Sequence, residues 1–352
     1  VGNIFKRRNI MRSVICVHER FERHWSFTAD YWHHRWQEEG GSELYRSEDP
    51  DARITELVPD PAEVQRLVIL GFPAESEDLT PFTILEECYW DDSWSGVSSS
   101  GIEEAETRGV NFLYVREPPY GDVQWGQSVA EFALGLTICG LRRIPQIYND
   151  MIKSHETWDY SAPGTDLGKP GQRSQQMGDD TRFTNGTIGG KRVRIVGMGN
   201  IGARYAAWCA ALGADVAVWD PIAKDATFNV AGVRRCFDKL ELVKDAEIFV
   251  PMMPLFDATR GIVNADMIDA LPTGCLVIAV TRAQICDCDA LYRRVLNDEL
   301  SMAADVFDVE PVPLDSHLLG RHNVVHTPHN AGRTIDANRT RADDAIARFR
   351  HR

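Results

Sequence analysis

The sequence feature that most constrains the fold is a glycine-rich hexapeptide, Gly197-Met198-Gly199-Asn200-Ile201-Gly202. An apolar run at 193–196 predicts a buried strand directly before it, and 203–212 has the composition of a helix. In such a strand–turn–helix unit the first glycine permits the tight turn, the second lets a pyrophosphate approach the backbone, and the third lets helix and strand pack closely. The N-terminus of the helix adds unpaired N–H groups that favour phosphate. The hexapeptide therefore predicts a dinucleotide-binding unit.

Asp220 supports this prediction, because it stands about 20 residues beyond the turn, at the end of the next predicted strand, 216–219. A carboxylate at that position accepts hydrogen bonds from the adenosine ribose hydroxyls and repels a 2′-phosphate. Pro221 and Ile222 follow it, with no arginine beside it, which favours NAD. Lys224 leaves NADP as the alternative cofactor.

The wider pattern is that of an α/β protein with two domains, for which 352 residues are sufficient. Strands alternate with helices in both halves, which predicts parallel sheets covered on both faces. In the second half the pattern predicts a doubly wound sheet of five or six strands over roughly 127–332. The predicted strands are 13–17, 67–70, 83–85, 112–115, 193–196, 216–219, 248–250, 276–280, 302–306 and 324–326. The clearest helices are 28–40, one from near 103, and 128–143, and a long exposed loop is predicted at 159–186.

Composition argues against several classes of partner. The chain has 38 basic and 52 acidic side chains, a formal net charge of −14, which repels nucleic acid and anionic membrane surfaces. No apolar run reaches the length of about 18 residues that a membrane span needs.

Eight cysteines are scattered, and the close pair Cys286 and Cys288 lacks the second ligand pair of a structural zinc site. We therefore expect a cytoplasmic protein with reduced thiols and no metal.

Three ionisable residues each follow a predicted strand in the second half: Arg282, Glu310 and His329. The carboxyl ends of parallel strands line the ligand crevice of an open sheet, so the three side chains could converge on one site. An arginine can bind a carboxylate through two parallel hydrogen bonds. A histidine beside a carboxylate is a suitable proton donor, because the negative charge favours the imidazolium. Each residue alone is more often a solvated surface group, but the triple after a dinucleotide turn favours a catalytic site.

The chain here resembles the D-isomer-specific 2-hydroxyacid dehydrogenases. The matching stretches are 193–202, 251–287, 303–319 and 323–334, and 128–136 resembles the helix that links the two domains of that family. The resemblance implies a Rossmann cofactor domain, 127–332, and a discontinuous flavodoxin-like substrate domain formed by 1–126 with 333–352. It also implies a site between the two domains and a homodimer.

The resemblance further implies that NAD exchanges hydride with the 2-carbon of a 2-keto or D-2-hydroxy acid. Arg282 would bind the substrate carboxylate, and His329 would move the proton, oriented by Glu310. The residues that would bind the cofactor are Gly197, Gly199, Asn200, Ile201, Gly202, Asp220, Pro254, Thr259, Thr281 and Asp305, the last beside the nicotinamide carboxamide. The backbone amides of Ser95, Gly96 and Val97 would hold the substrate carboxylate.

Some positions depart from the family pattern. Ser98 replaces the usual aspartate of the substrate loop, Ala283 replaces the glycine after the arginine, and the 159–186 loop is longer than usual. These departures leave the identity of the acid open. One alternative is a formate dehydrogenase, although that group carries glutamine where Glu310 stands. Another is a non-catalytic NAD-sensing protein similar to the C-terminal binding protein corepressors, which turnover of a keto acid would distinguish from an enzyme.

Overall fold

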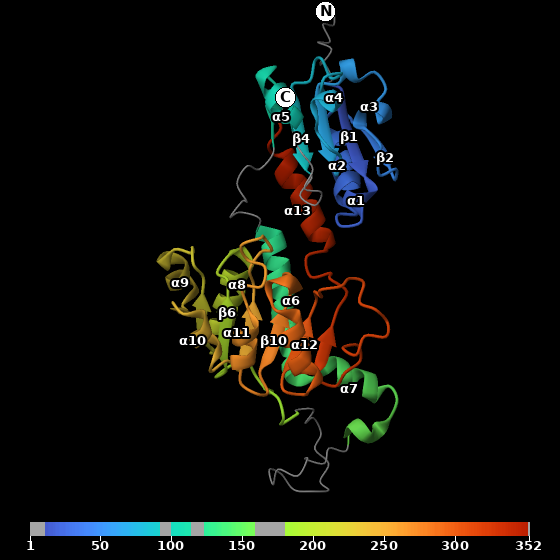
Figure 1. Ribbon diagram of the computed structural model, residues 1–352. Helices are drawn as coiled ribbons and strands as arrows, with labels where there is room; N and C mark the ends of the chain where they lie inside the picture. The colour runs from blue at the N-terminus through green and yellow to red at the C-terminus, as the bar shows by residue number, and fades with distance from the viewer. Residues whose placement is uncertain (1–10, 92–99, 114–122, 159–179, 351–352) are drawn as a thin grey trace, which may run out of the picture. The chain divides into compact units, whose positions relative to one another are not determined.

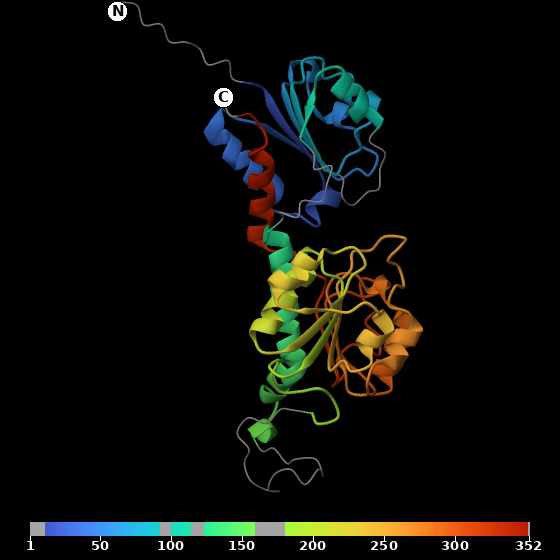
Figure 2. The same ribbon diagram turned by 90° about the vertical axis from the view of Figure 1, so that its left-hand side faces the viewer.

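The computed structural model describes residues 11–91, 100–113, 123–158 and 180–350. Contacts divide the chain into two compact units, Val1–Pro119 with Arg333–Arg352, and Tyr120–Gly332. The first boundary thus lies at 119/120, whereas we expected it at 126/127. Helix α6 (Val123–Arg142) starts earlier than expected, and its main contacts are with α8, β10 and β11 of the second unit. Figure 1 follows the chain from its N-terminus in blue to its C-terminus in red, and Figure 2 gives the same view turned by 90°.

Unit 1 contains a sheet of five parallel strands in the order β2-β1-β3-β4-β5. This is the flavodoxin-like strand order that the family resemblance implied. Its strands are β1 (Ser13–His18), β2 (Glu43–Ser47), β3 (Arg66–Leu70), β4 (Glu87–Asp91) and β5 (Asn111–Phe112). Its helices are α1 (Glu19–Glu22), α2 (Thr28–Glu39), α3 (Ile54–Leu57), η1 (Pro61–Glu63), α4 (Ser76–Leu79), α5 (Ser100–Thr107) and α13 (Ile335–Ile346).

Apolar side chains fill both faces of this sheet. On one face α3, α4 and α5 bury residues such as Ile54, Leu79 and Ile102 against β1, β3 and β4. On the other face α2 carries Trp32 and Trp36, and α13 lies alongside α2. The C-terminal helix therefore completes the first unit, although the whole second unit separates the two parts in the sequence.

One strand prediction in unit 1 is wrong. Residues 83–84 form a turn, residue 85 has no regular secondary structure, and the strand begins at Glu87. The prediction missed β4 because both of its ends are charged, yet Glu87 is 2% and Asp91 is 7% exposed. Arg66 pairs with Glu87 at 3.2 Å and Arg341 pairs with Asp91, so each buried carboxylate has a cationic partner.

Unit 2 contains seven parallel strands in the order β12-β11-β10-β9-β6-β7-β8. The strands are β6 (Arg192–Val196), β7 (Asp215–Trp219), β8 (Arg234–Arg235), β9 (Ile248–Pro251), β10 (Leu276–Ala279), β11 (Ser301–Ala304) and β12 (Val324–His326). The helices besides α6 are α7 (Ile144–Met151), η2 (His155–Trp158), α8 (Asn200–Ala211), α9 (Asp225–Ala231), α10 (Lys239–Val243), α11 (Ala265–Ala270), η3 (Ala283–Ile285) and α12 (Cys288–Leu296).

The sequence predicted five or six strands here, and the additional one is β8, whose two arginines give no apolar pattern. Two groups of helices cover the sheet. Helices α6, α8 and α9 bury residues such as Ala133, Tyr205 and Phe228 on one face, and α10, α11 and α12 bury residues such as Val243 on the other. This is the doubly wound α/β arrangement, and strand order reverses between β6 and β9, where such sheets bind ligands.

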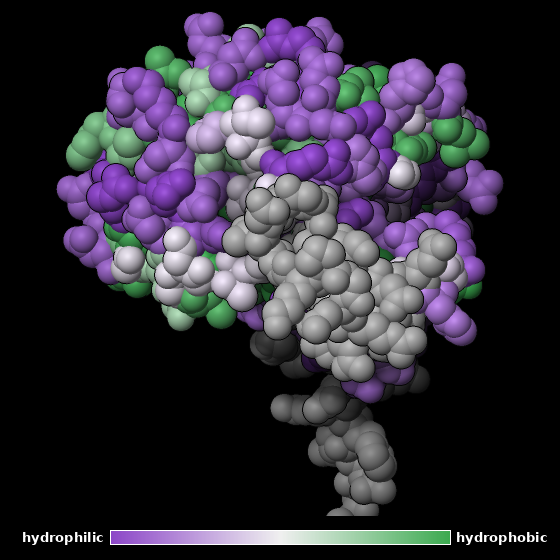
Figure 3. Space-filling view, turned by 90° about the horizontal axis from the view of Figure 1, so that it is seen from below, coloured by the Kyte–Doolittle hydropathy of each residue, from purple (hydrophilic) through white to green (hydrophobic). Residues whose placement is uncertain are grey.

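The described surface seen in Figure 3 is mainly hydrophilic, with hydrophobic residues interspersed. Among the described residues, no helix combines the length and apolarity needed to cross a bilayer.

Candidate active site

The glycine-rich turn connects β6 to α8, as predicted, and two of its glycines are required by packing. Gly197 has φ 111°, and a Cβ there would lie 2.8 Å from the carbonyl oxygen of Met252. A Cβ on Gly202 would lie 2.2 Å from the carbonyl oxygen of Gly197. A Cβ on Gly199 would instead meet no described atom within 4 Å. The turn is thus closed toward the protein and open at its middle glycine, as an approaching pyrophosphate requires.

Helix α8 begins inside this turn at Asn200, three residues before the predicted start. Its N-cap is Gly199, which offers no side-chain acceptor to the first-turn amides. Asp238, Asn264 and Asp287 cap α10, α11 and α12 with side-chain oxygens. The N-cap of α8 therefore places no side-chain acceptor between the first turn and an anionic ligand.

Asp220 follows β7, and the residue is only 6% exposed. Its Oδ2 accepts a hydrogen bond from the amide of Met198 at 2.7 Å, and its Oδ1 accepts from the amides of Ile222 and Ala223 at 2.9 and 2.8 Å. Asp220 therefore fastens the glycine-rich turn to the end of β7. Each carboxylate oxygen has about two acceptor sites, so Oδ2 retains capacity for one more donor, such as a ribose hydroxyl.

Glu310 and His329 lie in direct contact. Their side chains join through Nδ1 of His329 and Oε2 of Glu310 at 2.6 Å, and they are 24% and 33% exposed. The other carboxylate oxygen of Glu310 accepts the amide of Phe307 at 2.8 Å. In the described part of the chain no group bonds to Nε2 of His329, which leaves that nitrogen able to exchange a proton with a ligand.

Asp305 holds the loop that carries His329. It is 0% exposed, and its Oδ1 accepts from the Thr327 hydroxyl at 2.6 Å and from the Asn330 amide at 3.0 Å. Its Oδ2 accepts from the Ala331 amide at 2.9 Å. Sequence reasoning placed Asp305 near a nicotinamide, and it did not anticipate these contacts, because nothing local in the sequence pairs β11 with residues 327–331.

Arg282 follows Thr281, just beyond the carboxyl end of β10, and β10 is the strand next to β11 in the sheet. Arg282 is partly buried, and its Nη1 donates to the Thr281 carbonyl at 2.7 Å. Since β10, β11 and β12 are adjacent, Arg282, Glu310 and His329 all follow neighbouring strands at the same edge of the sheet. The structure brings Glu310 and His329 into contact and places Arg282 at the next strand.

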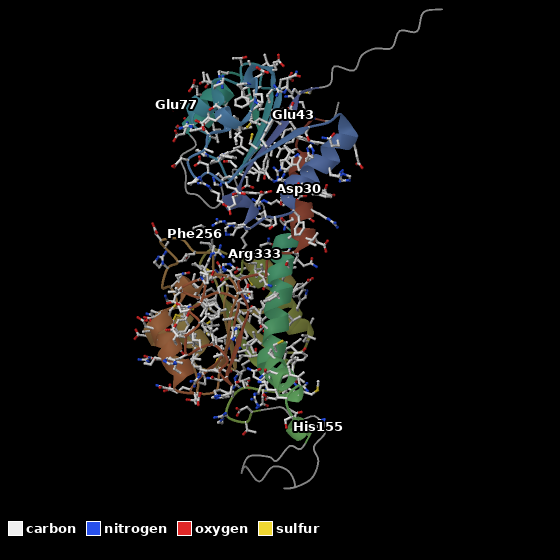
Figure 4. All side chains as sticks on the ribbon, turned by 90° about the vertical axis from the view of Figure 1, so that its right-hand side faces the viewer. Asp30, Glu43, Glu77, His155, Phe256 and Arg333 are labelled. Atoms are coloured by element: carbon white, nitrogen blue, oxygen red, sulfur yellow. The ribbon has the colours of Figure 1, made fainter. Side chains whose placement is uncertain are left out.

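The remaining predicted cofactor residues also lie at this edge. The hydroxyl of Thr259 donates to the Pro254 carbonyl at 2.5 Å and accepts the Phe256 amide at 2.8 Å, which closes the turn after β9. The hydroxyl of Thr281 donates to the Pro251 carbonyl at 3.4 Å. Figure 4 labels Phe256 at this end of unit 2 and His155 at the opposite end.

Two side chains that sequence reasoning missed support the turn that carries Glu310. The Tyr292 hydroxyl lies 2.9 Å from Oδ1 of Asp308, and Nε2 of Gln284 donates to the Asp308 carbonyl at 3.2 Å. Only the tertiary fold brings α12 and η3 to this turn, so no pattern in the sequence signals these contacts.

The predicted substrate loop, Ser95, Gly96 and Val97, lies outside the described residues. Within the described ranges, no three His, Cys, Asp or Glu side chains gather as a metal site. Sγ of Cys288 lies 3.7 Å from the Cys286 carbonyl, and burial raises the pKa of the Cys288 thiol to about 11.

Comparison with known proteins gives one family. Residues 163–331 match the model of the D-isomer specific 2-hydroxyacid dehydrogenase NAD binding domain. The chain is 33% identical to a hydroxypyruvate reductase of Thermotoga maritima over 248 residues, which are 69% of this chain and 70% of that protein. It is 28% identical to a D-3-phosphoglycerate dehydrogenase of Methanocaldococcus jannaschii over 243 residues, 69% of this chain but only 41% of that protein.

Solved structures agree on the fold. The apo D-lactate dehydrogenase of Escherichia coli superposes with a TM-score of 0.64 at 18% identity, covering 95% of both chains. A 2-hydroxyacid dehydrogenase of Ketogulonicigenium vulgare superposes with a TM-score of 0.67 at 19% identity, covering 96% of this chain and 94% of that one.

Proposed function

Because the chain belongs to the D-isomer specific 2-hydroxyacid dehydrogenase family, we propose that it is an oxidoreductase that interconverts a D-2-hydroxy acid and a 2-keto acid. The observation that carries the proposal is the 2.6 Å contact between His329 and Glu310 at the ligand-binding edge of the NAD binding domain. An imidazole held by a carboxylate, with its other nitrogen available, is suited to general acid–base catalysis.

NAD fits the residues present, since the uncapped amides of α8 and the open middle of the turn suit a pyrophosphate. When bound, it supplies or accepts the hydride. We assign the pyrophosphate to Gly197, Gly199, Asn200, Ile201 and Gly202. We assign the adenosine ribose to the remaining acceptor capacity of Asp220 and the rest of the cofactor to the strand-end turns of Pro254, Thr259 and Thr281.

In reduction of a keto acid, Nε2 of His329 gives its proton to the carbonyl oxygen, and in oxidation it takes the hydroxyl proton. Glu310 keeps the imidazole in one orientation through Nδ1 and stabilises its positive charge. Arg282 binds the substrate carboxylate with its planar guanidinium. Asp305 acts through the loop that it holds, and the backbone of Ser95, Gly96 and Val97 is the proposed second carboxylate contact.

We also propose that the protein forms a homodimer through α7. Ile144, Tyr148, Met151 and Ile152 are 47%, 64%, 46% and 66% exposed. Their spacing places them on one face of the helix, and an exposed apolar face of this kind is typical of protein interfaces.

The eight cysteines are free thiols, which supports a reducing compartment such as the cytoplasm.

The decisive experiment is a steady-state assay of NADH oxidation by the purified protein. The substrates are glyoxylate, hydroxypyruvate, pyruvate and phenylpyruvate, with NADH binding measured on the same preparation. We expect turnover with at least one keto acid, and turnover at least about a hundredfold slower with His329→Ala. Tight NADH binding without turnover of any keto acid would contradict an enzymatic role.

A further inference from the structure

Arg204 is a cation near the N-terminus of helix α8, the end at which the helix dipole favours anions. It lies in the second turn of α8, and its Nη1 donates to the carbonyl oxygen of Asn200 at 2.7 Å and to the side-chain oxygen of the same residue. The guanidinium therefore extends back along the helix toward its first residue. Positive charge at a helix N-terminus opposes the helix dipole, so this placement is unfavourable unless an anion joins it.

The N-terminus of helix α6 adds a second partial positive charge close to Asn200. Gly126 lies near the start of α6, and a Cβ on it would be 2.5 Å from Nδ2 of Asn200. Helix α6 starts at Val123, so two helices, of 20 and 12 residues, begin close to each other beside the glycine-rich turn. Nothing on the first turn of α8 offsets this positive charge, because that turn carries no acidic residue.

Along the glycine-rich turn and helix α8 the chain carries a single cationic side chain. Between Arg194 and Lys224, Arg204 is the sole lysine or arginine. Arg194 is not available, because it is 2% exposed and its guanidinium bonds to Asp215 and Asp245. Within the described ranges, Nη2 and Nε of Arg204 donate to no protein atom.

We propose that Arg204 binds the pyrophosphate of the cofactor. Its free donors and its charge complement the two phosphates, which the turn itself meets only with backbone amides. On binding, the hydrogen bond from Nη1 to the Asn200 side chain exchanges for one to a phosphate oxygen. The inference rests on the proposed function only in taking NAD as the ligand, and it adds to the predicted site a residue outside the glycine-rich hexapeptide.

The test measures binding rather than turnover. Dissociation constants for NADH, ADP-ribose and adenosine are determined for the wild type, Arg204→Gln, Arg204→Lys and the control Arg192→Gln. Arg192 is a suitable control because its side chain is 48% exposed at the start of β6, the end opposite to the turn. We expect Arg204→Gln to weaken NADH and ADP-ribose by about tenfold or more, the effect of losing charged hydrogen bonds. We expect Arg204→Lys to recover part of that loss.

Adenosine should bind all four proteins equally, and NADH binding to Arg204→Gln should depend less on salt than binding to the wild type. Equal NADH affinity in Arg204→Gln and the wild type would overturn the inference. A parallel loss of adenosine affinity would also overturn it, since Arg204 would then only maintain the shape of the site. A wild type that binds NADH but reduces no keto acid would refute the proposed enzymatic function, while the binding comparison would still decide the role of Arg204.

Discussion

Nδ1 of His329 lies 2.6 Å from Oε2 of Glu310, although the two residues are 19 positions apart in the chain. Glu310 is itself held by the Phe307 amide, and His329 stands on a loop fixed by Asp305. His329 has φ 53°, a left-handed backbone conformation that is uncommon for residues other than glycine. Both members of the pair are thus supported by separate sets of hydrogen bonds.

The first prediction is that His329 and Glu310 act as a unit. His329→Ala should lower kcat by about a hundredfold or more, the usual contribution of general acid–base catalysis. Glu310→Gln should lower it less, and the double variant should be no worse than His329→Ala, since Glu310 acts through the imidazole. NADH affinity should be unchanged in all three, with the exposed His326→Ala as control. Multiplying losses in the double variant would mean that the two residues work independently.

The second prediction concerns Arg282. Arg282→Lys should raise KM for the keto acid by about tenfold or more, because a lysine cannot make two parallel hydrogen bonds to a carboxylate. The dissociation constant of NADH should stay at the wild-type value. Arg260→Lys, an exposed substitution, provides the matched control. If KM for the acid is the same in Arg282→Lys and the wild type, Arg282 does not bind the carboxylate.

The third prediction concerns the buried carboxylate of Asp305. Asp305→Asn places an NH₂ group opposite donors of the 327–331 loop, so the free energy of unfolding should fall by about 1–3 kcal/mol. Urea unfolding checks this value, and the exposed Asp315→Asn is the control. Turnover should fall as well, because the loop positions His329. Unchanged stability would show that the loop keeps its conformation without Asp305.

The fourth prediction is a pH dependence at Arg194, on the interior strand β6 of the second sheet, which pairs with Asp245 in the segment before β9. Both nitrogens on one side of the Arg194 guanidinium bond to Asp245, at 2.8 Å each, and this contact lowers the pKa of that carboxyl below its ordinary value. A lowered pKa in the folded state stabilises the protein above the ordinary carboxyl pKa, and this contribution is lost as pH falls below about 4.

In Arg194→Met the pKa of Asp245 should therefore return toward its ordinary range, and the loss of stability on acidification should become shallower. Carboxyl titration by NMR and urea unfolding at several pH values measure the two effects. Arg293→Met is the control, since that side chain is 55% exposed on α12 and pairs with Asp269, not with Asp245. An unaltered pKa of Asp245 in Arg194→Met would contradict the assignment.

The fifth prediction concerns association. Tyr148→Glu and Ile152→Glu should each convert a dimer to a monomer, because a charge in an apolar interface is costly to desolvate. Sedimentation velocity gives the oligomeric state, and Leu212→Glu is the control at a residue 51% exposed at the end of α8. A monomeric wild type, or variants that remain dimeric, would exclude α7 as the interface.

The sequence predicted the elements whose own residues show a hydrophobic period or a required glycine. It missed strands whose side chains are explained only by contacts with residues far away in the chain. The strand, turn and helix around the glycine-rich hexapeptide are specified by backbone geometry that few other residues permit. Strand β4 was missed because its terminal carboxylates look like surface groups until Arg66 and Arg341 are placed beside them. Strand β8 was missed because two arginines show no apolar period.

The sequence by itself determined the α/β class, the dinucleotide turn and the placement of Arg282, Glu310 and His329 after consecutive strands, because these depend on hydrophobic period and on residue types that a position requires. Only the tertiary structure decided that Asp220 fastens the turn, that Asp305 holds the histidine loop, and that the guanidinium of Arg204 extends back to Asn200 at the start of α8. Those roles depend on which donors face a side chain in space, and hydrogen bonds between segments far apart in the chain leave no pattern along it.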